Sequence, residues 1–132
     1  MNDQELVRVR QVMTSEFLVV DGLMMVDKVL KLMKDKAARV LIIDKRHEND
    51  EYGIVLLSDV ARDVLAVNRA PERVNVYEIM SKPVVSVDPD MDIRYCARLL
   101  HKLKFTYVPV IEGDKVLGIV GYSSLVLNGL VK

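Results

Sequence analysis

The sequence predicts an α+β fold in which two β-α-β-β-α units pack sheet against sheet as one module with pseudo-twofold symmetry. The first observation behind this prediction is an internal repeat, because the segment 9–14 returns as 75–81. The spacing from Met13 to Asp21 also equals the spacing from Met80 to Asp88. The second observation is that short apolar runs and amphipathic patterns follow in the same order after each opening. A unit of about 60 residues buries too little surface to be stable alone, so the two copies are expected to fold together.

Each copy opens with an apolar run that predicts a strand, at 17–20 in the first copy and 84–87 in the second. A helical pattern follows each run. Its apolar face holds Val26, Val29, Leu30 and Met33 in the first copy and Ile93, Cys96, Ala97 and Leu100 in the second. Asp88-Pro89 fits the start of the second of these helices, since proline is tolerated in a first turn.

Two further apolar runs separated by polar residues predict a hairpin in each copy, and a second amphipathic helix closes the copy. The hairpin strands are expected at 40–43 and 52–57, and at 106–111 and 116–120; the closing helices are expected around 60–65 and 125–130. The first hairpin loop, 45–51, is almost wholly charged and is predicted to be exposed and mobile. The chain therefore divides into a first repeat at 1–67, a linker at 68–75 and a second repeat at 76–132.

Composition limits the classes of function. The 132 residues carry a formal net charge of +0, which gives no long-range field for nucleic acid and favours a chain that hides surface in an oligomer. No apolar run approaches the roughly 20 residues that span a bilayer, so no membrane insertion is expected. Cys96 is the single cysteine, so no disulfide forms within the chain, and a cytoplasmic location is expected.

The repeat resembles a tandem pair of cystathionine β-synthase (CBS) domains, the arrangement called a Bateman module. The motifs that carry the resemblance are the openings at Val9 and Val76, Gly53-Ile54-Val55 with Asp59, the strand 108–112, and Gly118-Ile119-Val120. Each motif is short, but their order and near-equal spacing in two copies extend the resemblance over nearly the whole chain. It implies adenosine-containing ligands such as AMP, ADP, ATP or S-adenosylmethionine in clefts between the copies, and a homodimer shaped as a flat disc.

The resemblance also implies candidate site residues. The family's ribose and phosphate signature is Gly-x-x-Thr/Ser-x-x-Asp. In the first copy it runs from Gly53 to Asp59, with Leu56 at the hydroxyl position and Ser58 two positions away. In the second copy Gly121 and Ser124 replace the hydroxyl and the carboxylate, so a single ligand is expected at the cleft that uses Asp59. The candidates for the adenine and phosphate walls are Ser81, Lys82, Pro83, Val84, Val108 and Pro109.

These residues also have purely structural interpretations. Asp59 follows Ser58, a fitting N-cap, and would then complement a helix dipole, which stabilises by about 0.3–1 kcal/mol. Lys82 fits a solvated turn residue, and Pro83 fits a residue that shapes the entry to a strand.

Two functional hypotheses follow. In the first, an adenosine-containing ligand binds between the copies and thereby alters an unidentified partner protein. In the second, the chain is a ligand-free interaction or oligomerisation module with degenerate sites. An enzyme is not expected, because His47 and His101 fit solvated positions, Cys96 fits a buried one, and no metal-ligand spacing or phosphate-binding glycine loop occurs.

Overall fold

The computed structural model describes residues 6–131. Helices and short strands are mixed along the chain, and the strands form small sheets, which confirms the predicted α+β class. The chain forms two compact units: unit 1 combines Met1–Ser15 with Val85–Lys132, and unit 2 is Glu16–Val84. These units differ from the sequence division at 68–75, because the opening segment of each repeat joins the unit built by the rest of the other repeat.

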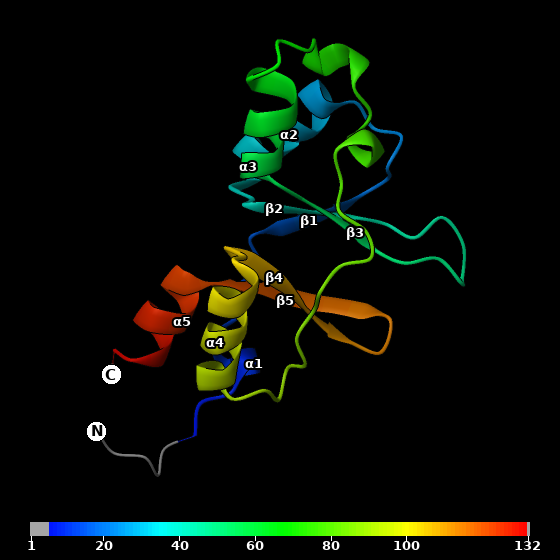
Figure 1. Cartoon of the computed structure of the whole chain (residues 1–132). Helices are drawn as coiled ribbons and strands as arrows, with labels where there is room; N and C mark the ends of the chain where they lie inside the picture. The colour runs from blue at the N-terminus through cyan, green and yellow to red at the C-terminus, as the bar shows by residue number, and fades with distance from the viewer. Residues whose placement is uncertain (1–5, 132) are drawn as a thin grey trace. The chain divides into compact units, whose positions relative to one another are not determined.

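Unit 2 is built on a three-stranded sheet in the order β1 (Phe17–Val20), β2 (Val40–Ile43) and β3 (Gly53–Leu56). β1 pairs with β2 in parallel, and β2 pairs with β3 antiparallel. All four residues of β2 are buried, as the central strand of a covered sheet requires. The helices α2 (Val26–Lys36) and α3 (Leu57–Val60) lie on one side of this sheet (Figure 1).

The second helix of the first copy is irregular. α3 continues directly into a π-helical turn, η1 (Ala61–Leu65), where the Ala66 N–H donates to the Ala61 carbonyl at 2.8 Å. Two 3-10 turns follow, η2 (Pro71–Arg73) and η3 (Val76–Glu78). The predicted linker therefore contains a short helical turn of its own.

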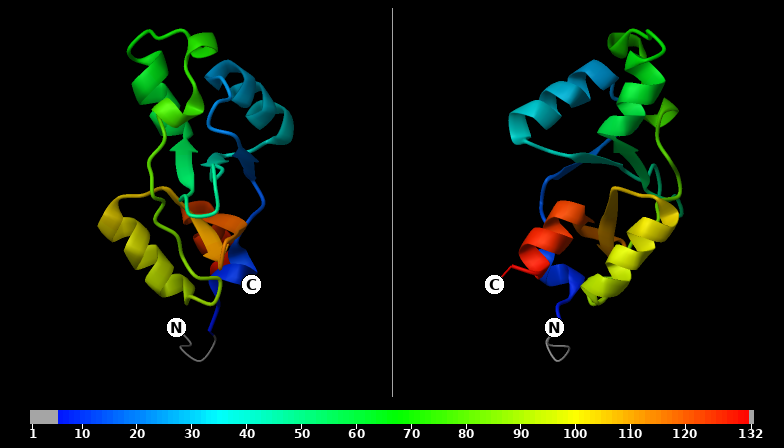
Figure 2. Two further views of the ribbon diagram at one scale, coloured as in Figure 1. Left: turned by 90° about the vertical axis from the view of Figure 1, so that its right-hand side faces the viewer. Right: turned by 60° about the vertical axis from the view of Figure 1, so that its left-hand side comes forward.

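Unit 1 is built on an antiparallel hairpin of β4 (Tyr107–Glu112) and β5 (Lys115–Gly121). The helices α1 (Val9–Val12), α4 (Ile93–Leu103) and α5 (Tyr122–Gly129) lie on one side of the hairpin (Figure 2). The core of this unit includes Val9 and Val12 of α1 together with Cys96 and Leu100 of α4, all at most 1% exposed.

The opening segment of each repeat is fixed to the third strand of the other repeat. Thr14 exchanges two backbone hydrogen bonds with Ile119 of β5, at 2.9 and 3.0 Å. The repeat-equivalent residues Ser81 and Ile54 exchange the same two bonds, both at 2.9 Å. The same pairing in both units explains why the compact units do not follow the order of the repeats.

The predicted strand at 84–87 is wrong. Val87 alone forms a parallel bridge with Val110 of β4. The bridge consists of the Val87 N–H on the Pro109 carbonyl at 3.0 Å and the Ile111 N–H on the Val87 carbonyl at 3.1 Å. The next rung of this ladder needs an N–H from residue 109, and proline has none.

The predicted helix start at Asp88-Pro89 is also wrong. α4 begins at Ile93, and its N-cap is Asp92, whose carboxylate accepts the Arg94 N–H at 2.9 Å. Asp88 instead accepts the Asp90 N–H at 2.8 Å, the side-chain hydrogen bond of a tight turn.

Candidate functional site

Most of the predicted ligand-binding residues lie in unit 2, around β3. The pairing of Ser81 with Ile54 lays the segment that begins at Ser81 along this strand. Glycine at position 53 lets Met80 pack close to the strand, because a Cβ there would lie 2.6 Å from the Met80 sulfur. The structure therefore brings the signature segment of the first copy and the start of the predicted wall segment to the same strand.

Asp59 is buried at the start of the helix that follows β3, with 8% of the residue exposed. Its Oδ2 accepts the Leu56 N–H at 2.8 Å, because the carboxylate lies one helical turn beyond that free backbone donor. The N-cap is Leu56 and the helix begins at Leu57, so the prediction that Ser58 caps this helix is wrong. Ser58 is the second helical residue and is exposed.

The other oxygen of Asp59 faces an arginine that the sequence analysis did not single out. The Arg62 guanidinium donates to Asp59 Oδ1 at 3.0 Å and forms a two-point contact with Asp63 at 2.9 and 3.0 Å. The hydrogen bonds that Arg62 donates, first to Asp63 and then to Asp59, raise the pKa of Arg62, and the hydrogen bond from Arg62 lowers the pKa of Asp63. The three side chains form one charged cluster on the first and second turns after β3.

Lys82 does not point freely into solvent as a turn residue would. Its ammonium lies 2.6 Å from Asp50 Oδ1, in the charged loop between β2 and β3. Hydrogen bonds from Lys82 and from the backbone N–H groups of Arg46 and Glu51 hold the pKa of the Asp50 carboxyl well below its ordinary 3.8. The loop is exposed at residues 46–49, as predicted, but it is tied down at Asp50; its mobility stays a prediction.

The equivalent segment of the second copy has the same local geometry without the charge. Ser124 is buried where Asp59 stands in the first copy, and its hydroxyl accepts the Gly121 N–H at 3.0 Å. A Cβ at Gly121 would lie 2.6 Å from the Tyr107 ring and 2.9 Å from the Thr106 carbonyl oxygen. The position that the family signature assigns to a hydroxyl is therefore filled by the tyrosine.

The remaining predicted residues have separate positions. Pro83 is exposed and Val84 is partly buried, both in unit 2. Val108 and Pro109 are buried in β4 of unit 1, where Val108 belongs to the core and the Pro109 carbonyl accepts from Val87. The joint use of these two residues with Asp59 stays a prediction.

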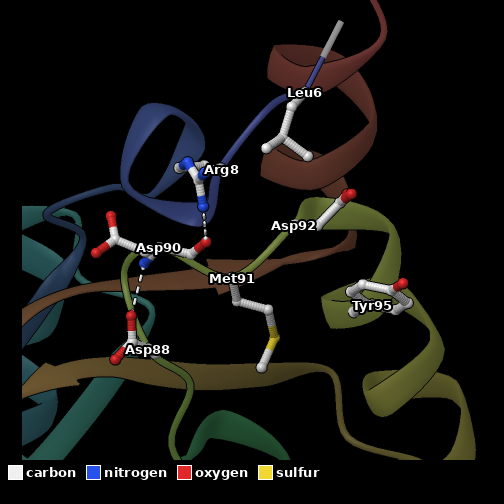
Figure 3. A pocket seen from close by; sticks show the side chains of 7 residues that line it. All are labelled: Leu6, Arg8, Asp88, Asp90, Met91, Asp92 and Tyr95. Carbon is white, nitrogen blue, oxygen red and sulfur yellow. Dashed lines mark hydrogen bonds between the residues drawn. The ribbon is translucent and has the colours of Figure 1, made fainter. Parts of the chain in front are cut away.

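A shallow pocket of about 640 Å³ lies in unit 1, and none of the residues predicted to bind a ligand lines it. Its lining is Leu6, Arg8, Asp88, Asp90, Met91, Asp92 and Tyr95 (Figure 3). Arg8 donates to the Asp90 carbonyl at 2.6 Å, and the Asp90 carboxylate pairs with Arg10 at 2.9 Å. These charges are satisfied within the chain. Within residues 6–131 no cluster of histidine, cysteine or acidic side chains is placed to hold a metal ion, and no helix is long and apolar enough to cross a membrane.

Sequence reasoning missed Arg62, Asp50 and Tyr107. A usable signal was present for Arg62, because the charged set Asp59, Arg62 and Asp63 is replaced as a whole by Ser124, Leu127 and Asn128 in the second copy. The roles of Asp50 and Tyr107 depend on contacts between distant segments, which a single sequence does not reveal.

Comparison with known proteins agrees with this geometry. The CBS domain model matches residues 9–66 and 76–128. The chain belongs to the CBS domain family. The predicted CBS pair is thereby confirmed, and such pairs are regulatory modules.

Solved structures of CBS proteins share the fold. A hexameric CBS-CP12 protein from bloom-forming cyanobacteria is 36% identical with a TM-score of 0.90, covering 96% of this chain and 74% of that one. A putative signal-transduction protein with CBS domains from Burkholderia ambifaria is 26% identical with a TM-score of 0.79, covering 94% of both chains. A CBS protein from Pyrobaculum aerophilum, 11% identical with a TM-score of 0.79 over 93% of both chains, was solved with AMP. A further CBS pair, 21% identical with a TM-score of 0.77 over 92% of this chain and 94% of that one, was solved with 5′-methylthioadenosine and S-adenosyl-L-methionine.

The curated relatives are longer than this chain. An uncharacterized protein from Methanocaldococcus jannaschii is 24% identical over 110 residues, which are 83% of this chain and 59% of the relative. One from Methanopyrus kandleri is 26% identical over 91 residues, 68% of this chain and 45% of the relative. The matches span about half the length of these relatives.

Proposed function

We propose that this CBS pair binds one adenosine-containing ligand, AMP, ADP, ATP or S-adenosylmethionine, through Asp59 and thereby regulates a partner protein. The observation that carries the proposal is the buried Asp59 carboxylate, retained at the end of β3 in one copy alone. CBS pairs solved with AMP or with S-adenosyl-L-methionine share this fold, which supports the class of ligand.

The hydrogen bonds of Asp59 leave room for a ribose. Each carboxylate oxygen has two lone pairs, and each accepts one hydrogen bond, from Leu56 or from Arg62. One acceptor site per oxygen remains, which matches the two hydroxyl donors of a ribose diol. The bond to Leu56 also fixes the carboxylate, so a ligand meets an acceptor that is already oriented.

The second copy supports a single site per chain. Where the first copy has a carboxylate, the second has the Ser124 hydroxyl, which already accepts the Gly121 N–H and donates to the Gly121 carbonyl. Tyr107 occupies the space beside Gly121. The π-helical turn also occurs in the copy that keeps the carboxylate, and such turns are frequent at functional sites.

The competing proposal is a ligand-free interaction module. It is favoured by Leu56 at the position where the family signature has a hydroxyl. It is also favoured by two ion pairs within the chain, because Lys82 already pairs with Asp50 and Asp59 already pairs with Arg62. In this version Asp59 only caps the N-terminus of the helix. A hydrogen bond to a charged group at such a position contributes about 1.5–3 kcal/mol to stability.

Both versions include a homodimer or larger assembly, no catalytic activity and a cytoplasmic location. A matching set of exposed apolar residues on the last helix of each repeat supports self-association. The set consists of Leu57, Ala61 and Leu65 in the first copy and of Tyr122, Val126 and the C-cap residue Leu130 in the second.

Isothermal titration calorimetry of the chain with AMP, ADP, ATP and S-adenosylmethionine tests the proposal. We expect micromolar binding of at least one ligand, weakened at least about tenfold by Asp59→Asn, because tenfold corresponds to about 1.4 kcal/mol and a lost charged hydrogen bond costs at least that much.

Asp63→Asn is the matched control, since Asp63 also contacts Arg62 but lies outside the signature segment. Its affinity should stay close to that of the wild type. Equal affinity of Asp59→Asn and wild type would contradict the assignment of the site, and no heat with any of the ligands from folded protein would favour the ligand-free module.

A further inference from the structure

Apart from Tyr95 and Leu103, the exposed face of α4 consists of basic side chains and one histidine. No acidic residue occurs from Ile93 to Lys104. The helix buries Ile93, Cys96 and Leu100, and the opposite side presents Arg94, Tyr95, Arg98, His101 and Lys102, all exposed. We call these five residues the basic face.

The equivalent helix of the first copy has a different pattern at the same positions. The five residues of α2 are Asp27, Lys28, Lys31, Lys34 and Asp35. Asp27, Lys31 and Asp35 alternate in sign at four-residue spacing, which supports a solvated helix. In α4 the two aspartates are replaced by Arg94 and Lys102, so the basic face is specific to the second copy.

This pattern is unfavourable for the isolated helix. Arg94, Arg98 and Lys102 follow one another at four-residue spacing, and each like-charged pair at this spacing destabilises by about 0.2–0.5 kcal/mol. The helix dipole favours the cations of the last turn, but Arg94 lies in the first turn, where the dipole disfavours a cation. The stability of the helix therefore does not explain the basic face.

Salt bridges among the described residues neutralise only part of the positive charge of the basic face. Arg94 pairs with Asp92 at 2.7 Å, and this contact lowers the pKa of the Asp92 carboxyl. Arg98 and Lys102 form no salt bridge with any residue of the described part of the chain. The Arg98 guanidinium lies 5.3 Å from the centre of the Tyr95 ring, and this tyrosine is 61% exposed and also lines the pocket of unit 1 (Figure 3).

We propose that the basic face of α4 is a docking surface for an acidic segment of a partner protein. Guanidinium groups match carboxylates with two parallel hydrogen bonds, and the exposed tyrosine adds apolar contact to a peptide. A helix of 11 residues is about 16 Å long, which suits a short peptide. The chain as a whole has a net charge of +0, so its surface outside this face is net negative and would repel a long nucleic acid.

The test is fluorescence anisotropy of a labelled oligoglutamate peptide with wild type, Arg98→Glu and the matched control Lys31→Glu. Both variants change the net charge equally, and Lys31 is the α2 equivalent of Arg98. We expect binding by the wild type, a loss of about tenfold for Arg98→Glu, and affinity within about twofold for Lys31→Glu. Arg98→Glu also creates opposite-charge pairs with Arg94 and Lys102, so its thermal unfolding midpoint should not fall.

Several results would overturn the proposal. These are no binding by the wild type, an equal loss in both variants, or a change in molar mass for Arg98→Glu in light scattering, which would make the face a contact between copies. Tighter binding of duplex DNA or of phosphatidylserine vesicles with the same Arg98 dependence would assign it to those partners instead. The inference goes beyond the proposed ligand site and is tested without nucleotide; Asp59→Asn should bind the peptide as the wild type does.

Discussion

At the residue scale, one position performs the same structural role in both repeats with different chemistry. Asp59 and Ser124 each accept the backbone N–H of the residue three positions earlier, at 2.8 and 3.0 Å. A hydroxyl is enough to close the start of the helix, so capping alone does not require the carboxylate of Asp59. The sequence identified both residues, but the capping role depends on where the helix begins, which differs from the predicted start.

Introducing the hydroxyl of the family signature at position 121 of the second copy should destabilise the protein. Gly121→Thr places a side chain against the Tyr107 ring and the Thr106 carbonyl oxygen, where even a Cβ would lie at 2.6 and 2.9 Å. We expect a loss of about 1–3 kcal/mol in the free energy of unfolding, as is usual for overpacking, measured by urea denaturation.

The matched control is Leu56→Thr, the same hydroxyl at the equivalent position of the first copy. Leu56 pairs with Val40 across the sheet, whereas Gly121 pairs with Tyr107, so the first copy has space where the second has a ring. Equal stability of Gly121→Thr and wild type would show that Tyr107 does not close this position.

At the element scale, apolar periodicity predicted which segments become helices and hairpin strands. α2 and α4 bury the predicted faces, and the strands β1 to β5 fall within about one residue of the predicted runs. The failures are local: Pro109 lacks the N–H that a strand at 84–87 would need, and the turn at Asp88 precedes the true cap at Asp92. Each failure depends on one hydrogen bond, which an average over a window of residues does not detect.

Both long helices end in a left-handed residue that is not glycine. Ala37 has φ 53° and Lys104 has φ 58°, at equivalent positions of the two repeats. A residue with a Cβ is destabilised by about 1–2 kcal/mol in this region of φ. Replacement by glycine removes this strain, but about half of the gain in stability is lost because glycine gives the unfolded chain more conformational freedom. Ala37→Gly and Lys104→Gly should each raise the free energy of unfolding by about 0.5–1 kcal/mol in urea denaturation.

Ala66→Gly is the control for this prediction, because Ala66 is an exposed alanine with φ −65°. It should lower stability by up to about 1 kcal/mol, since glycine has no conformational advantage there. A decrease for all three variants would contradict the account of the helix ends.

At the scale of the whole molecule, the two repeats have diverged in complementary ways. The first keeps the charged cluster of Asp59, Arg62 and Asp63, while the second replaces it and carries the basic face on α4. This divergence fits a division of labour in which one repeat binds a ligand and the other contacts a partner. The sequence revealed the repeat and the family, but ion pairs such as Lys82 with Asp50 join segments far apart in the chain and required the structure.

The exposed apolar residues of the closing helices predict how the chain associates. Leu65 is 77% exposed and Leu130 is 62% exposed, at equivalent positions of the two repeats. Single exposed apolar residues are ordinary, but the recurrence of the same exposed set on both closing helices is typical of a surface that contacts another protein. Size-exclusion chromatography with light scattering should give at least twice the 15.0 kDa of one chain.

Leu130→Glu should shift this mass toward that of a single chain, because a charge buried in an apolar contact without a partner opposes association. Leu23→Glu is the control, since Leu23 is 72% exposed but lies in the turn before α2 and is not part of the closing helices. It should keep the mass of the wild type. A single 15.0 kDa species for the wild type at micromolar concentration would contradict self-association, and equal dissociation of both variants would show that the closing helices are not the contact.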